Sequence, residues 1–298
     1  MHVAVLTKEV IEYLAPQPGQ NFIDGTCGAG GHSLAILEKI LPGGQLLCLD
    51  WDNDAIGRAQ AKIAAKNAKW LQQVIFINDS YANLAKVIAQ KKFGPVNGVL
   101  LDLGLSSDQL AVSGRGFSFL ADEALDMRYS LANELTAAAI INQWDQVSLE
   151  KIFKEYGEER WAKKISQAII KNRKQKPILT TTELVGVMTQ AVPRKFQYGR
   201  THFATRIFQA LRIAVNDELG NLQRFLPQSL DSLENGGRAV IISFHSLEDR
   251  LVKNFFREQA KTGRVEILTK KPQVPSPQEI AQNPRSRSAK LRAIKKIS

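Results

Sequence analysis

The sequence predicts an α/β fold with a mostly parallel sheet, interrupted by a helical insertion. Continuous apolar segments alternate with helical ones over the first hundred residues; the alternation then stops and resumes near residue 203. Strands of this continuous apolar kind are buried on both faces, which is typical of a parallel sheet covered by helices. The length of 298 residues fits about two domains of roughly 150 residues each.

Five apolar segments have the length and composition of buried strands, and a sixth is a candidate. The five are residues 21–24, 45–49, 74–78, 98–103 and 238–244, and the candidate is 265–269. Between these segments, apolar residues recur at the spacing of an amphipathic helix. The expected helices are 32–40, 54–67, 81–91, 205–222 and 247–259.

The insertion is expected over residues 108–202, because no convincing strand follows the fourth until that point. Helices are expected near 133–144, 148–156 and 158–172, and Thr180 with Glu183 has the spacing of a capping box. The first domain is then discontinuous, formed by 1–107 and 203–298. From about residue 270 the chain is rich in proline and then basic, so we expect an arm there.

The charge of the chain is concentrated in two segments. The net charge is +11, with ten basic and two acidic residues in 261–298 and nine basic and three acidic residues in 151–177. Clustered positive charge suits a polyanion such as nucleic acid, although a merely solvated face is the alternative. No segment has the length of a membrane span, so we expect no membrane partner.

Cysteine and histidine content argues against metal and disulfide chemistry. Cys27 and Cys48 are too few for a disulfide framework or a zinc site, and the four histidines lack metal-ligand spacing. We therefore expect no metal and a cytoplasmic protein. His245 and its acidic neighbours resemble a catalytic pair, but capping of the next helix by Ser246 or Asp249 is the interpretation we favour.

Three acidic residues end predicted strands: Asp24, Asp50 and Asp102. Ligands of open parallel sheets bind at this edge. A glycine turn, residues 25–31, follows Asp24, and Asp50 lies where a carboxylate can accept hydrogen bonds from a ribose. The pattern predicts an adenosine-type cofactor. Because Asp24 would repel a pyrophosphate and suits an ammonium, we favour S-adenosyl-L-methionine over nicotinamide or flavin cofactors.

The sequence resembles the ribosomal RNA small subunit methyltransferase H family along nearly its whole length. The motifs that carry the resemblance are DLGLSSDQL from Asp102, RGFSF from Arg115, LDMR from Leu125, YGEE from Tyr156, ATRIFQALRIAVNDEL from Ala204, SFHSLEDR from Ser243 and NPRSRSAKLR from Asn283. The resemblance implies a Rossmann-like methyltransferase domain interrupted by a helical substrate-recognition domain. It also implies S-adenosyl-L-methionine-dependent methylation of the exocyclic N4 of a cytidine in the decoding region of small-subunit (16S) rRNA.

The resemblance also implies site residues and partners. Matching the family motifs places its cofactor contacts on Gly30, Gly31, His32, Asp50, Tyr81, Asp102 and Gln109. The implied partner is small-subunit rRNA or the small ribosomal subunit. The oligomeric state stays open, with a homodimer as one option.

We expect Asp102 to be the catalytic residue, with a pure cofactor ligand as the alternative. Cytosine N4 is a weak nucleophile that needs alignment and a hydrogen-bond acceptor more than a strong base. Phe117 and Phe119 are candidates for stacking on the cytidine, or else core residues of the insertion.

Phosphate contacts are expected from basic residues of the motifs and of the arm. They are Arg115, Arg128, Arg206, Arg212, Arg285, Arg287, Lys290 and Arg292. Two rival functions remain open at this point: a small-molecule methyltransferase, and a non-catalytic RNA-binding protein that keeps a cofactor pocket.

Overall fold

The computed structural model describes residues 4–104, 114–199 and 202–298. The chain divides into two compact units: unit 1 combines Met1–Gly104 with Leu219–Ser298, and unit 2 is Leu105–Glu218. The expected boundary at 203 differs from this division by one helix, α10 (Thr205–Asn216). Its apolar face is buried in the core of unit 2 against α6 (Ala137–Gln143) and α7 (Gln146–Glu155), which explains the difference.

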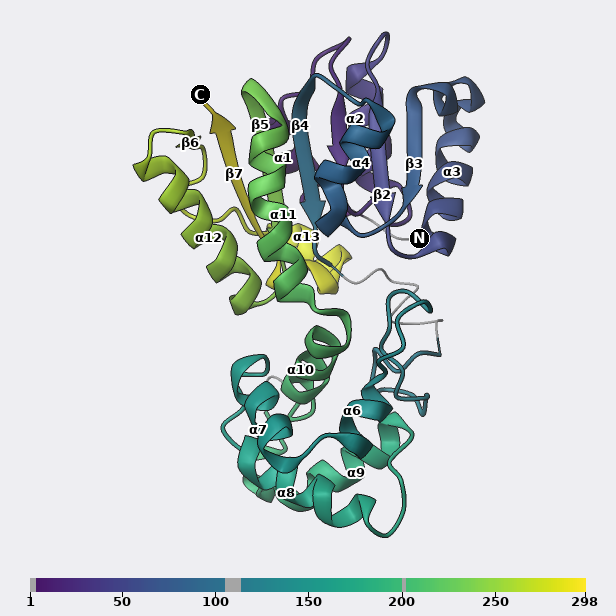
Figure 1. Ribbon diagram of the computed structural model, residues 1–298, viewed down its shortest axis with the longest axis vertical. Helices are drawn as coiled ribbons and strands as arrows, with labels where there is room; N and C mark the ends of the chain where they lie inside the picture. Colours follow the sequence, from purple (N-terminus) through teal and green to yellow (C-terminus); the bar gives the residue numbers. More distant parts are fainter. Residues whose placement is uncertain (1–3, 105–113, 200–201) are drawn as a thin grey trace. The chain divides into compact units, whose positions relative to one another are not determined.

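Unit 1 is built on a seven-stranded sheet, as far as the described residues show (Figure 1). Its strands are β1 (Phe22–Asp24), β2 (Leu46–Asp50), β3 (Val74–Asn78), β4 (Val96–Asp102), β5 (Leu233–Ser243), β6 (Val265–Ile267) and β7 (Lys290–Lys296). Their order is β3-β2-β1-β4-β5-β7-β6, and the first five strands in this order are parallel. This confirms the mostly parallel sheet and all six expected strands.

Helices cover both faces of this sheet. The helices of unit 1 are α1 (Thr7–Leu14), α2 (Gly31–Ile40), α3 (Asn53–Asn67), α4 (Leu84–Lys91), α11 (Glu218–Ser232), α12 (Ser246–Lys261) and α13 (Pro277–Gln282). Apolar side chains of α1, α2 and α3 form one core with one face of the strands, and those of α4, α11 and α12 form a second core with the other face. Both faces being buried, the strands need continuous apolar sequences.

The expected arm from residue 270 is wrong over its last segment, because β7 is an internal strand of the sheet. It pairs antiparallel with both β5 and β6. Leu291, Ala293 and Ile294 are fully buried, and Arg292 is only 8% exposed. An internal strand buries both of its faces. Burial of the apolar residues therefore decides where this basic segment packs, in spite of its charges.

Unit 2 is helical. Its described helices are α6 (Ala137–Gln143), α7 (Gln146–Glu155), α8 (Ala162–Arg173), α9 (Thr181–Ala191) and α10. The capping box expected at Thr180 is present at the start of α9, with Glu183 as its partner. The single helix expected over 205–222 is wrong, because Asp217 adopts a left-handed conformation (φ 47°) and ends α10 there. Within the described ranges, no helix is long and apolar enough to cross a bilayer.

Candidate functional site

The carboxyl edge of the sheet in unit 1 brings together the ends of β1, β2 and β4. β1 lies between the other two strands, with Asp24 paired with Cys48 on one side and with Leu100 on the other. Asp50 and Asp102 each lie two residues beyond these partners, so both carboxylates flank the turn that follows β1. This edge is where parallel sheets bind ligands.

The glycine turn after β1 contains two left-handed glycines with different surroundings. A Cβ on Gly30 (φ 75°) would lie 2.9 Å from the Cα of Ala59, so this glycine lets the turn pack closely on α3. A Cβ on Gly28 (φ 49°) would meet no atom closer than 4.0 Å. Gly28 therefore faces open space, and a ligand can approach its backbone.

Asp50 links this turn to the end of β2. Its Oδ2 accepts a hydrogen bond from the Gly28 amide (2.8 Å), and its Oδ1 accepts one from the Asp52 amide (2.9 Å). Burial raises the pKa of Asp50 to about 6, although these two backbone hydrogen bonds oppose the rise. Each oxygen keeps a second lone pair, which suits the carboxylate to the two hydroxyls of a ribose.

Asp24 lies buried beneath the glycine turn and holds it through hydrogen bonds. Its carboxylate is fully buried and accepts hydrogen bonds from the Ser33 hydroxyl (2.6 Å) and the Thr26 amide (3.2 Å). Burial raises its pKa. The interpretation that Asp24 offers an open carboxylate to a ligand ammonium is therefore wrong, because the turn folds over it. The sequence reasoning missed the roles of Thr26, in the turn, and Ser33, in the first turn of α2, although hydroxyl residues beside a buried carboxylate are a usable signal.

His32 and Asp102 meet on the other side of the turn. The Nε2 atom of His32 lies 3.4 Å from Oδ2 of Asp102, yet both ring nitrogens of His32 are buried without a hydrogen-bond partner among the described residues. Asp102 is held by its own amide, which donates to the Thr26 hydroxyl (2.7 Å). A buried imidazole without partners is costly unless a ligand or water satisfies it, so it marks this point as ligand-facing.

Tyr81 follows β3 in the short 3-10 helix η2 (Tyr81–Asn83). Its ring packs edge-on against Phe225 at 5.4 Å, and its Cβ lies 3.5 Å from the position of a Cβ on Gly25, the first residue of the turn. The aromatic side chain therefore lies beside the glycine turn. Gly31 packs against Ala4. Gln109 lies outside the described residues.

Two further candidates of the sequence have structural roles. The SFHSLEDR segment begins helix α12, and its capping box is formed by His245 and Glu248 rather than by Ser246 or Asp249. The prediction that this segment caps the helix is thus confirmed, but the predicted capping residues are wrong. Cys27 is buried, and the Cys48 thiol and burial raise its pKa, which leaves it a packing residue.

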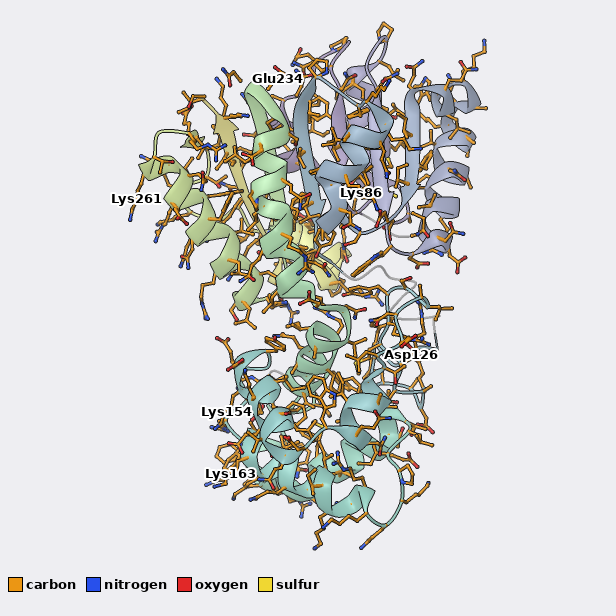
Figure 2. All side chains as sticks on the ribbon, viewed as in Figure 1. Lys86, Asp126, Lys154, Lys163, Glu234 and Lys261 are labelled. Atoms are coloured by element: carbon orange, nitrogen blue, oxygen red, sulfur yellow. The ribbon has the colours of Figure 1, made fainter. Side chains whose placement is uncertain are left out.

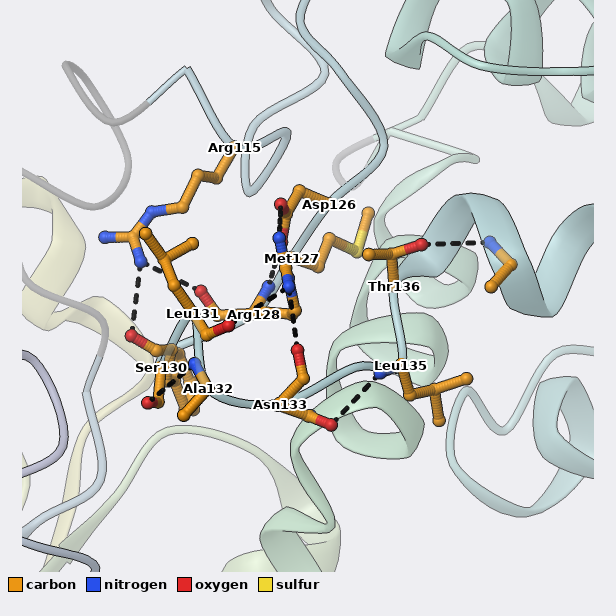
Figure 3. A network of polar contacts seen from close by, with 12 residues as sticks. Arg115, Asp126, Met127, Arg128, Ser130, Leu131, Ala132, Asn133, Leu135 and Thr136 are labelled. Atoms are coloured by element: carbon orange, nitrogen blue, oxygen red, sulfur yellow. Dashed lines mark hydrogen bonds and ion pairs between the residues drawn. The ribbon is translucent and has the colours of Figure 1, made fainter.

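Charged side chains of unit 2 fall into two groups. Lysines of α7 and α8, such as Lys154 and Lys163, lie on its surface (Figure 2). The arginines of the LDMR and RGFSF motifs lie instead in an internal network (Figure 3). Arg128 forms two hydrogen bonds with the Asp126 carboxylate (2.8 and 2.7 Å) and others with the carbonyls of Leu131 and Asn133. Arg115 donates to the carbonyls of Arg128 and Tyr129.

Intramolecular hydrogen bonds use part of each of these guanidinium groups, so the phosphate contacts expected from them stay a prediction. Besides the two motif arginines, Arg212 pairs with Glu218 (2.8 and 3.0 Å), Arg206 donates to the Glu158 carbonyl, and Arg292 pairs with Asp249. Lys290 lies 3.7 Å from the same Asp249. Arg285 and Arg287 lie in the exposed 3-10 helix η4 (Pro284–Ser288).

Both candidate stacking rings are occupied by neighbouring side chains. Phe117 is buried in the core of unit 2 and stacks on Tyr129 at 5.6 Å. Phe119 is half-buried, stacks on His202 at 4.6 Å and meets Phe208 edge-on. These contacts favour the core interpretation for both residues.

Comparison with known proteins decides the family. The sequence model of the MraW methylase family matches residues 1–297. The chain belongs to the MraW methylase family. Relatives named ribosomal RNA small subunit methyltransferase H from Heliobacterium mobile and Geotalea daltonii are each 45% identical over 99% of this chain, covering 99% and 98% of their own lengths. The resemblance seen in the sequence is confirmed.

The fold of this MraW family member also has structural relatives. A protein from Clostridium thermocellum described as an rRNA-methylase superposes with a TM-score of 0.51 at 12% identity, with all of both chains covered. At this identity the likeness concerns the fold. It agrees with the Rossmann-like sheet of unit 1 and its flanking helices.

Proposed function

We propose that the protein transfers a methyl group from S-adenosyl-L-methionine to the exocyclic N4 of one cytidine in the decoding region of small-subunit rRNA. The observation that carries the proposal is the arrangement at the carboxyl edge of unit 1, where Gly28, Asp50, His32 and Asp102 surround one turn. Membership of the MraW methylase family and the names of its relatives support methyl transfer to small-subunit rRNA.

The residues at this edge fit the cofactor group by group. Gly28 leaves room for a ligand against its backbone, and Asp50 is placed to accept hydrogen bonds from the ribose hydroxyls. Tyr81 offers an aromatic face beside the turn for the adenine ring. The unpartnered nitrogens of His32 supply a buried hydrogen-bonding group that a bound ligand satisfies. Gly30 and Gly31 keep the turn packed closely on its neighbours.

The proposed chemistry places Asp102 at the reacting amino group. S-adenosyl-L-methionine supplies a methyl group on a positively charged sulfur, and its transfer to N4 releases one proton. The Asp102 carboxylate accepts a hydrogen bond from the N4 amino group, which aligns its lone pair, and then takes up the released proton. The Thr26 hydroxyl, which accepts from the Asp102 amide, and the Gly104 amide, 3.3 Å from Asp102 Oδ1, hold this residue in place. Nitrogen attacks directly, so no cysteine nucleophile is needed.

A cytidine stacked within RNA cannot enter such a site. The proposal therefore includes a base that leaves its stack and is read on its Watson–Crick edge. The exposed lysines of unit 2 supply sequence-independent attraction for the rRNA backbone.

The test is transfer of labelled methyl groups to small-subunit particles purified from cells that lack this protein, followed by nucleoside mapping. We expect label in N4-methylcytidine at one position of the decoding region, with naked small-subunit rRNA assayed in parallel. Label at a carbon or at a ribose hydroxyl would contradict the N4 assignment. Transfer to small molecules but not to particles would favour the small-molecule methyltransferase, and cofactor binding without any transfer would favour the RNA-binding protein.

A further inference from the structure

A pocket of unit 1, away from the glycine turn, lies between helix α12 and strands β6 and β7. It has a volume of about 350 Å³, which is at the lower end of the range for small-molecule sites. Its lining residues are Lys253, Phe256, Arg257, Ile267, Thr269, Lys270 and Arg292. Four of these seven side chains are cationic, and no acidic side chain lines the pocket.

The charge of this pocket is only partly neutralised. Asp249, one turn before Lys253 on α12, holds Arg292 through two hydrogen bonds (2.6 and 3.2 Å). Arg257 and Lys270 are exposed and form no ion pair within the part of the chain that the structure describes. Glu266, the acidic residue of β6, belongs to the opposite face of its strand from Ile267. The pocket therefore keeps a net positive charge.

The inner wall combines a hydroxyl with an apolar surface. Thr269 is 3% exposed; its hydroxyl oxygen accepts a hydrogen bond from the Ala293 amide (2.9 Å) and donates none to the described residues. Phe256 and Ile267 form the apolar part of the lining. One buried hydroxyl donor among several cations suits an anion with tetrahedral oxygens, and the apolar wall suits the sugar beside it.

The register of the sheet relates this pocket to Asp102. Asp102 pairs with Ile242 in β5, and Ile242 pairs with Leu291 in β7, so Arg292 lies one residue from the level of Asp102. Three strand spacings separate β4 from β6, which is about 14 Å at about 4.8 Å each. The pocket thus lies beside the same edge of the sheet as the candidate active site. The distance between them corresponds to a few nucleotides of an extended RNA strand.

We propose that this pocket binds a backbone phosphodiester of the substrate RNA next to the target nucleotide. The inference rests on the proposed function and names a contact surface for its substrate. It assigns phosphate contacts to Arg257 and Lys270, two residues that the sequence analysis did not include among the expected phosphate ligands. Because these groups touch only the RNA backbone, they position the substrate and leave the cofactor site unchanged.

The test compares Arg257→Glu and Lys270→Glu with Lys86→Glu, an exposed charge reversal on α4 (Figure 2). We expect each pocket variant to raise KM for small-subunit particles or rRNA several-fold, and the double variant to raise it roughly tenfold, with kcat little changed. The slope of log affinity against log salt should become less steep by about 0.7 for each phosphate that the variant no longer binds. Calorimetry with S-adenosyl-L-methionine should give the wild-type affinity for all variants, which also checks that they fold.

Two outcomes would overturn the inference. One is a KM and salt slope of the double variant equal to those of Lys86→Glu in an assay where the wild type transfers methyl groups. The other is binding of inorganic phosphate to the pocket at millimolar concentration that does not compete with the binding of RNA. That result would identify a site for small anions. If the wild type transfers no methyl group to any RNA, the proposed function fails instead, and filter binding of RNA by the same variants still tests the pocket.

Discussion

The glycine turn of unit 1 and the loop of unit 2 that carries the RGFSF and LDMR motifs (residues 114–136) both contain glycines with carboxylates and hydrogen-bonding side chains beside them, but they use these groups in opposite ways. At the turn, Gly28 faces open space, and both ring nitrogens of the adjacent His32 lack a hydrogen-bond partner among the described residues, although Nε2 lies 3.4 Å from Asp102 Oδ2. In the loop, Arg115 and Arg128 together bond one carboxylate and four backbone carbonyls. The first region leaves hydrogen-bonding groups for a ligand, whereas the second uses many of its donors within the protein.

This difference shows why a motif and a binding site are separate things. A guanidinium that hydrogen-bonds within a loop has fewer donors left for a phosphate than an exposed lysine or arginine outside any motif. The comparison predicts that changes at the turn alter cofactor binding or turnover at nearly constant stability. Changes in the loop should do the reverse.

The largest expected effect belongs to Asp102→Asn. The amide keeps the shape of the side chain but cannot take up a proton, so kcat at saturating cofactor should fall by about 100-fold or more. The affinity for S-adenosyl-L-methionine should stay within about threefold. Methyl transfer and calorimetry measure the two quantities, with Asp54→Asn, an exposed acid of α3, as the matched control. Unchanged turnover with weakened cofactor binding would make Asp102 a cofactor ligand only.

Asp50→Ala should act on binding. The change removes the acceptors for the ribose hydroxyls and for the Gly28 amide, which corresponds to about 2–3 kcal/mol, or roughly 30- to 150-fold in the Kd of the cofactor. Calorimetry with S-adenosyl-L-methionine gives the value, and Asp54→Ala serves for comparison. An affinity equal to that of the control would remove Asp50 from the site.

The same carboxylate predicts a pH dependence of cofactor affinity. Burial raises the folded-state pKa of Asp50 to about 6, above the ordinary value of 3.8, so the folded apo-protein retains a proton between these values and loses this stabilising contribution as the pH rises through them. A ribose hydroxyl donates best to the ionised form. Cofactor affinity should therefore be about tenfold weaker at pH 5 than at pH 7. The Asp50→Asn variant should lack this slope; if it keeps the slope, another group is responsible.

The smallest effect is expected from Arg128→Lys in the loop. Lysine cannot reproduce the paired hydrogen bonds to Asp126 together with those to two carbonyls, so the loop should lose about 1–2 kcal/mol. Faster hydrogen exchange over residues 114–136 would report the loss, with Arg194→Lys, an exposed arginine, as control. Cofactor affinity should not change. A variant that binds cofactor poorly but exchanges normally would break the comparison.

Much of unit 1 could be predicted from the sequence because its parallel strands are buried on both faces. The segments at β1 to β4 are short apolar runs bounded by turns, and the acidic ends of β1, β2 and β4 mark the edge where the site lies. Asp50 and Asp102 follow from that logic alone. The burial of Asp24 does not, since it depends on how the turn folds over it and on the Ser33 hydroxyl.

Other features depend on contacts between distant segments. The basic composition of 290–296 suggests an arm, but pairing with β5 and β6 makes it an internal strand. The helix break at Asp217 lies within a continuous amphipathic pattern, and helix α1 has no strong sequence signal. The arginines of unit 2 looked available because spacing says nothing about the carbonyls that surround them.

The pairing of β4 with β5 has a consequence for the order in which the molecule is assembled. Val99 pairs with Ala239, and the whole of unit 2 lies between them in the chain. During synthesis β4 emerges first, and the backbone N–H and C=O groups along one of its edges stay unpaired until the inserted helices and β5 have been made. Such an edge invites pairing with other chains. The length of the inserted unit therefore sets how long this edge of β4 stays open to such pairing.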